Sequence, residues 1–205
     1  FEQEFDLTMR NVGILIFDKV EVLDFCGPFE VFSSALLPGM PETYPEPSLF
    51  RAWTVGVTRE PIRAVGGLEV IPACSIDDHP DFDIIVVPGG YGTRTIPQEA
   101  GDWIARISPR LEITTSVCTG AFLLAQAGVL TGKPATTHWA SIDGLRERFP
   151  AIEVRDDERV VDAGAVITSA GVSAGIDMAL HVVERLHGRE AAELTARFME
   201  YEWSS

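Results

Sequence analysis

Two apolar segments of strand length constrain the fold of this chain most strongly. Residues 11–17 and 82–87 are almost wholly apolar, and the second runs into the glycine pair Gly89-Gly90. Strands that face water on one side alternate apolar and polar residues, whereas strands covered on both faces are apolar throughout. These segments therefore predict the middle of a mainly parallel sheet.

Strand-like and helix-like patterns alternate along the rest of the chain. Further strands are expected at 52–57, 111–117, 135–139 and within 160–168, and a hairpin or a pair of short strands at 63–76. Helices are expected at 28–35, 99–107, 120–128, 141–148 and 173–201, with a break near His187-Gly188, and a surface loop at 37–48. Strands that alternate with helices predict an α/β fold.

Length and composition favour one domain. A chain of 205 residues that is 46% hydrophobic can bury one large core. We expect a flexible acidic tail at residues 1–10 and a single domain at 11–205. No apolar run reaches 18 residues and no signal peptide is recognisable, so neither a membrane span nor a secreted protein is expected.

Charge and cysteine content narrow the possible partners. The formal net charge of −15 argues against nucleic acid or an anionic membrane as partner, because both attract clustered Lys and Arg. The three cysteines lack metal-ligand spacing, which favours reduced thiols in the cytoplasm and no metal; for Cys26 and Cys74 core packing is expected. No nucleotide or dinucleotide motif is present, so no cofactor is predicted.

The remaining cysteine, Cys118, lies where a predicted strand turns into a predicted helix. Small residues, Ser116 and Gly120, stand two positions before and after it. Bulkier side chains there would collide where the backbone reverses, as at the nucleophile elbow of serine hydrolases. The N–H groups and dipole of a helix N-terminus favour a thiolate. We therefore interpret Cys118 as a nucleophile; the alternative is a buried core cysteine.

Asp24 lies in an apolar neighbourhood, residues 22–25, shortly after the first predicted strand. One possibility is that it caps the helix expected from Pro28, because aspartate is a favoured N-cap. The other is that burial and a nearby thiolate raise its pKa, so that its carboxyl group holds a proton and delivers it. We favour the catalytic role, because ligands of parallel sheets gather outside the carboxyl ends of the strands.

The glycine pair Gly89-Gly90 ends another strand at this edge of the sheet. It could be only a tight turn, or its N–H groups and that of Thr119 could stabilise a developing anion. We predict the second role for these three residues. His138 is a candidate base, but no spacing brings it to Cys118, and a structural histidine is favoured.

Five segments of the sequence resemble the ThiJ/PfpI family, within the class I glutamine amidotransferase-like superfamily. They are LDFCGP (23–28), PGG (88–90), TSVCTG (115–120), ATTHW (135–139) and AGID (174–177). The resemblance spans almost the whole chain. It implies a flavodoxin-like three-layer sandwich, usually a homodimer, with Cys118 as nucleophile and Asp24 as the nearby acid.

Within this family the chain is most similar to the isonitrile hydratases. Protease-like and glyoxalase- or deglycase-like members often have histidine after the cysteine or glutamate at the acid position, where this chain has Thr119 and Asp24. The resemblance implies hydration of a small-molecule isonitrile to an N-substituted formamide, without a cofactor, through a thioimidate on Cys118.

Three other functions are weighed against hydration. A non-catalytic redox or stress sensor would use reversible oxidation of Cys118. A glyoxalase- or deglycase-like enzyme would act on reactive carbonyls. Related domains also form the N-terminal half of AraC-type regulators, but the chain ends soon after its last predicted helix, so no DNA-binding module is expected.

Overall fold

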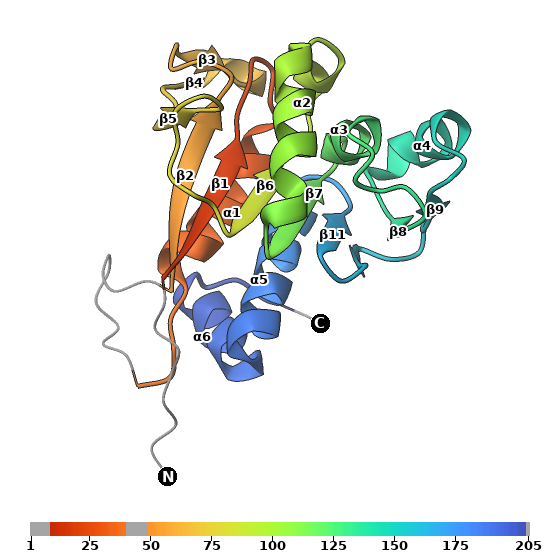
Figure 1. Cartoon of the computed structure of the whole chain (residues 1–205). Coiled ribbons are helices and arrows are strands. Elements are labelled where there is room, and N and C mark those ends of the chain that lie inside the picture. Colours follow the sequence, from red (N-terminus) through yellow and green to blue (C-terminus); the bar gives the residue numbers. More distant parts are fainter. Residues whose placement is uncertain (1–8, 40–48, 204–205) are drawn as a thin grey trace.

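The computed structural model describes residues 9–39 and 49–203 and has a seven-stranded sheet at its centre (Figure 1). The strand order is β10-β11-β7-β6-β1-β2-β5. The strands are β1 (Arg10–Leu15), β2 (Phe50–Gly56), β5 (Cys74–Ser75), β6 (Ile84–Val87), β7 (Ile113–Val117), β10 (Val160–Asp162) and β11 (Val166–Ser169). Neighbours pair in parallel except β10 and β11, which are antiparallel.

Helices cover both faces of this sheet, which makes the flavodoxin-like sandwich that was predicted. They are α1 (Val22–Ser34), α2 (Gln98–Ile107), α3 (Gly120–Gln126), α4 (Ile142–Arg148), α5 (Ala174–His187) and α6 (Arg189–Phe198). Helices α1 and α5 pack together on one face, and α2 and α3 on the other (Figure 1). No helix among the described residues is long and apolar enough to cross a membrane.

Short elements complete the fold. Strands β3 (Ile62–Arg63) and β4 (Glu69–Val70) form the expected hairpin, and β8 (Pro134–Ala135) pairs in parallel with β9 (Glu153–Val154). Four 3-10 turns lie at Val65–Gly67, Tyr91–Arg94, Ser108–Arg110 and Trp139–Ser141.

The two apolar segments form central strands, as predicted. All four residues of β6 are fully buried, and β1 lies beside it with Val12, Ile14 and Leu15 equally buried. Burial of these side chains from both faces provides the main stabilisation of the sheet.

Two element predictions need correction. Helix α1 begins at Val22 rather than near Pro28, which lies inside the helix. Asp24 is therefore in the first turn of α1 and is not an N-cap. The strand expected at 135–139 ends at Ala135, because the Thr136 N–H and the Thr137 hydroxyl bond to side-chain and backbone oxygens near the elbow instead of a strand.

Other predictions concern the ends of the chain and the loops. The helical region at 173–201 breaks at Gly188, which has a φ of +88°, as predicted. Of the predicted tail, residues 1–8 lie outside the described residues, and Arg10 is the first residue of β1. Of the loop expected at 37–48, residues 40–48 also lie outside them.

Candidate active site

Cys118 occupies a sharp turn between β7 and α3. Its φ is +57°, a left-handed conformation that is uncommon for a residue with a side chain. The Cys118 N–H fixes this turn by donating to the carbonyl oxygens of Ser169 and Ala170, each at 3.2 Å. A Cβ atom on Gly120 would collide with the Val87 carbonyl oxygen, so the elbow requires glycine two residues after the cysteine.

Asp24 lies beside Cys118, and the thiol donates a hydrogen bond to its carboxylate. Asp24 is fully buried, and Cys118 is 7% exposed. The Gly89 N–H donates to Asp24 Oδ2 at 2.9 Å, and the Val172 N–H donates to Oδ1 at 3.1 Å. The carboxyl ends of β6, β7 and β11 and the start of α1 therefore bring together the pair that the sequence predicted.

Burial dominates the acidity of the Asp24 carboxyl group. It raises the pKa of Asp24 from 3.8 to about 7, and the negative charge of Glu21 acts in the same direction. The Gly89 N–H, the Cys118 thiol and the Val172 N–H lower the pKa, but together they do not offset the burial. A carboxyl group in this environment is half protonated near neutral pH, which suits it to proton transfer.

The expectation of a lowered thiol pKa is wrong for this pair. Burial, and then the negative charge of Asp24, raise the pKa of the Cys118 thiol to about 12, although the N–H and hydroxyl of Thr119 lower it. The pair therefore loses one proton near pH 7 and keeps the other into alkaline solution. The remaining proton is shared between sulfur and carboxylate, so the thiolate forms when Asp24 takes it.

The three predicted anion-binding residues all contact the reacting pair or each other. The Gly89 N–H binds Asp24, and the Gly90 N–H donates to Thr119 Oγ1 at 3.0 Å. The N–H and hydroxyl of Thr119 donate to the Cys118 sulfur. In this arrangement the glycine N–H groups fix the acid and the threonine, and only Thr119 faces the nucleophile.

His138 does not meet Cys118 through a hydrogen bond recorded for the described residues. Its Nδ1 atom accepts from the Ala140 N–H at 3.2 Å, and its ring packs so closely on Gly171 that a Cβ atom there would collide with it. The histidine caps the 3-10 turn at Trp139–Ser141. This is the structural role that was favoured.

Two residues of the site escaped the sequence-based reasoning. Val172 has a φ of +56°, which for a β-branched residue is an outlier, and this conformation directs its N–H to Asp24. Thr137 donates its hydroxyl to the Cys118 carbonyl oxygen at 2.7 Å. Neither role could be recognised from the type of residue. For Val172, the conformational preference of valine even argues against a positive φ.

Arg159 contacts both ends of the loop that carries Val172. Its carbonyl oxygen accepts from the Ala170 N–H at 2.9 Å, and its guanidinium donates to the Ser173 hydroxyl at 2.9 Å. The same guanidinium forms an ion pair with Asp177 at 2.6 Å. Arg159 is thus placed to position the Val172 N–H without touching the reacting pair.

No group of three or more His, Cys, Asp or Glu side chains that could hold a metal occurs within residues 9–39 and 49–203.

Comparisons with known proteins show which family has this sequence and fold. The model of the DJ-1/PfpI family matches residues 10–185. Isonitrile hydratase from Pseudomonas putida is 36% identical over 193 residues, which are 93% of this chain and 78% of that protein. The HTH-type transcriptional regulator GbdR from Pseudomonas aeruginosa is 28% identical over 195 residues, and this chain covers 51% of its length.

Among solved structures, a ThiJ/PfpI family protein from Pseudomonas syringae has a TM-score of 0.83 at 29% identity, covering 96% of this chain and 77% of that one. The family match includes the strands, the elbow and the acid, from the first residue of β1 into α5. By sequence and by fold, the chain belongs to the DJ-1/PfpI family.

Proposed function

We propose that this chain is an isonitrile hydratase that converts an isonitrile and water into an N-substituted formamide. The observation that carries the proposal is the buried contact between the Cys118 thiol and the Asp24 carboxylate. Such a pair supplies a nucleophile and a proton donor to one carbon atom. The similarity to isonitrile hydratase over 93% of the chain supports the same reaction.

The first step forms a covalent intermediate. Transfer of the shared proton to Asp24 leaves the Cys118 thiolate, which attacks the terminal carbon of the isonitrile. Asp24 then delivers this proton to the same carbon as the carbon–sulfur bond forms. The product is a neutral thioimidate on Cys118, and the negative charge now resides on the Asp24 carboxylate.

The second step releases the formamide. Water adds to the thioimidate carbon, one of its protons goes to nitrogen, and Asp24 accepts the other as the carbon–oxygen double bond forms. The carbon–sulfur bond breaks and the thiolate leaves, so that the protonated acid and the thiolate are restored. Both protons of water are thus accounted for in the product or in Asp24, and no cofactor enters the balance.

The backbone donors at the site have distinct tasks in this scheme. The N–H and hydroxyl of Thr119 stabilise negative charge on sulfur at attack and at release. The Gly89 and Val172 N–H groups keep the Asp24 oxygens in place. The Gly90 N–H holds the Thr119 hydroxyl, which completes the arrangement around the nucleophile.

The experiment is turnover of one aryl and one alkyl isonitrile by the wild-type protein, Cys118→Ala and Cys118→Ser, with formamide measured by chromatography. We expect formamide only with the wild type, and a protein adduct of the isonitrile mass during turnover. Turnover by Cys118→Ala at the wild-type rate would refute the mechanism. Lack of turnover by the wild type would refute the proposal.

The same preparation separates the alternatives. Methylglyoxal consumed by the wild type, without isonitrile turnover, would favour glyoxalase- or deglycase-like chemistry. Peroxide modification of Cys118 without any turnover would favour a redox sensor, although 7% exposure of this residue limits access to sulfur. The homodimer, the cytoplasmic location and the lack of a nucleic-acid partner stay predictions, and light scattering of the purified protein tests the first.

A further inference from the structure

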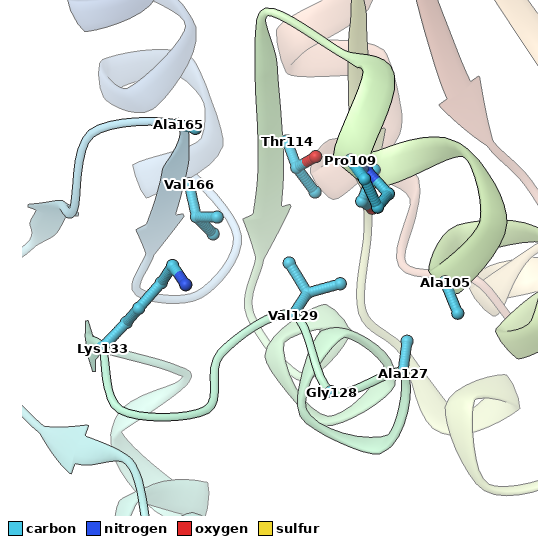
Figure 2. A pocket seen from close by; sticks show the side chains of 10 residues that line it. Ala105, Pro109, Thr114, Ala127, Gly128, Val129, Lys133, Ala165 and Val166 are labelled. Carbon is cyan, nitrogen blue, oxygen red and sulfur yellow. The ribbon is translucent and has the colours of Figure 1, made fainter.

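A cavity lies at the amino ends of β7 and β11, at the edge of the sheet away from Cys118 (Figure 2). Its volume is about 310 Å³. Thr114, which lines it, precedes Cys118 by four residues of extended chain, or about 13 Å along the strand. The lining residues are Ala105, Ser108, Pro109, Thr114, Ala127, Gly128, Val129, Lys133, Ala165 and Val166. The cavity is therefore separate from the candidate active site.

One positive charge faces this cavity. The Lys133 side chain extends along its wall and brings the amino group next to Val166 (Figure 2). No carboxylate among residues 9–39 and 49–203 forms an ion pair with it, whereas eight of the arginines described there form one. In a chain with a net charge of −15, a half-buried lysine without an acidic partner is unusual.

A hydroxyl group at the cavity also lacks a partner. Ser108 lines the cavity, and its Oγ atom is buried without a hydrogen bond to any described residue. A buried hydroxyl left unpaired costs free energy, and an acceptor on a ligand would remove this cost. The Thr114 hydroxyl points toward Pro109, on the same side of the cavity (Figure 2).

The remaining walls are apolar and suit a small organic group. Ala105, Pro109, Ala127, Val129 and Val166 supply them. Ligand cavities of proteins typically begin at about 300 Å³ and combine apolar walls with a few polar groups that orient the ligand. A cavity with one cation and one unpaired hydroxyl donor suits an anion that carries an apolar body.

We propose that this cavity is a second binding site, for a small monocarboxylate with an aliphatic or aromatic body. The carboxylate pairs with the Lys133 amino group and accepts from Ser108, while the body lies against the apolar walls. The alternative is that Lys133 only balances the partial negative charge at the C-terminus of α3. The two differ in whether an anion binds.

The test uses the fact that the chain has only two lysines, Lys19 and Lys133. Reductive methylation with ¹³C-formaldehyde labels both lysine amino groups, together with the N-terminal amine, and keeps their charge. Sodium benzoate is titrated at constant ionic strength, with benzamide as its neutral counterpart. We expect benzoate to shift the Lys133 signal with saturation at millimolar concentrations, as suits so small a ligand. The exposed Lys19 is the internal control and stays unshifted.

A variant locates the interaction in the unlabelled protein. The backbone amide chemical shifts of Gly128, Val129 and Ala165 report the binding of benzoate. We expect Lys133→Met to lower the affinity for benzoate by about tenfold or more. Ser108→Ala should weaken benzoate by a few-fold.

Three results would overturn the proposal. They are a Lys133 signal that does not move with benzoate, equal binding of benzamide, and unchanged benzoate affinity in Lys133→Met. Because these readouts do not involve Cys118, they stand or fall independently of isonitrile turnover.

Discussion

The central sheet has a carboxyl edge, where its parallel strands end, and an amino edge, where they begin. The two edges differ in backbone conformation. At the carboxyl edge, positive φ angles fall on Gly90 but also on residues with side chains, among them Cys118 and Val172. At the amino edge, beside the cavity, they fall on Gly128 and Gly164, for which they are unstrained. Strain at the first edge persists because the surrounding hydrogen bonds over-determine it.

Hydrogen bonding divides the two edges in the same way. The Asp24 carboxylate accepts from two backbone N–H groups and a thiol, whereas Ser108 and Lys133 at the cavity have no partner of these kinds among the described residues. The carboxyl edge is thus arranged for chemistry on its own side chains. The amino edge has unused polar groups, which are free to meet a ligand.

The largest effect is expected from glycine substitutions that compare the edges directly. Gly120→Ala places a Cβ atom against the Val87 carbonyl oxygen, whereas the space around Gly128 is open. We expect Gly120→Ala to lower the free energy of unfolding by more than about 3 kcal/mol. Gly128→Ala should cost about 1–2 kcal/mol for its φ alone. Urea unfolding measures the free energy of unfolding of both variants. Equal losses would contradict the difference between the two edges.

The next largest effect concerns the acid. Asp24→Asn keeps the volume, but it cannot hold a transferable carboxyl proton, and its amide NH₂ group faces backbone donors. We expect kcat/KM for an isonitrile to fall by about 10²–10⁴-fold. Asp162→Asn, at a carboxylate paired with Arg185 away from the elbow, is the matched control and should stay within about twofold of the wild type. A fall of less than tenfold in Asp24→Asn would remove Asp24 from the mechanism.

The dependence of the reaction on pH follows from the coupled pair. Below pH 7 both groups are protonated, so no thiolate forms; the single ionisation near pH 7 creates the reactive state. We expect kcat/KM, and the rate of Cys118 alkylation by iodoacetamide, to rise through about pH 7 and then level off. In Asp24→Asn only the thiol ionises, so the rise should move to higher pH. An unchanged profile would show that Asp24 does not control the ionisation.

Much of this edge could be predicted from the sequence because its requirements are local. Small residues around Cys118 indicate an elbow, and apolar strands indicate a parallel sheet whose ends converge. The left-handed Val172 could not be predicted, because tertiary contacts impose a conformation against its propensity. The high thiol pKa also escaped prediction, since burial beside a carboxylate depends on packing that no motif encodes.

A smaller effect is expected from the residue that positions Val172. Arg159→Ala removes the guanidinium contacts to Ser173 and Asp177 but keeps the backbone bond to Ala170, so one end of the loop is released and the Val172 N–H should hold Asp24 less well. Because this N–H lowers the pKa of Asp24, the rise of the pH profile should move upward, with a kcat loss of about tenfold or less.

Arg185→Ala is the matched control for this variant. It removes another arginine paired with an aspartate on the same side of the sheet, and it should leave the profile in place. If both variants lower kcat without moving the profile, Arg159 is only structural.

The smallest effect on turnover is expected from Lys133→Met. This variant tests whether the cavity at the amino edge and the candidate active site at the carboxyl edge act independently. The residue lies at the cavity, and the strand between this cavity and Cys118 is buried and fully paired. Removing the charge of Lys133 should change kcat/KM for an isonitrile by less than about twofold, because substitutions far from an active site rarely disturb it. The same variant should lose benzoate binding, so one protein preparation gives both readings. A large loss of turnover would instead show that the amino edge acts on the elbow through β7, and the two edges would then be one coupled unit.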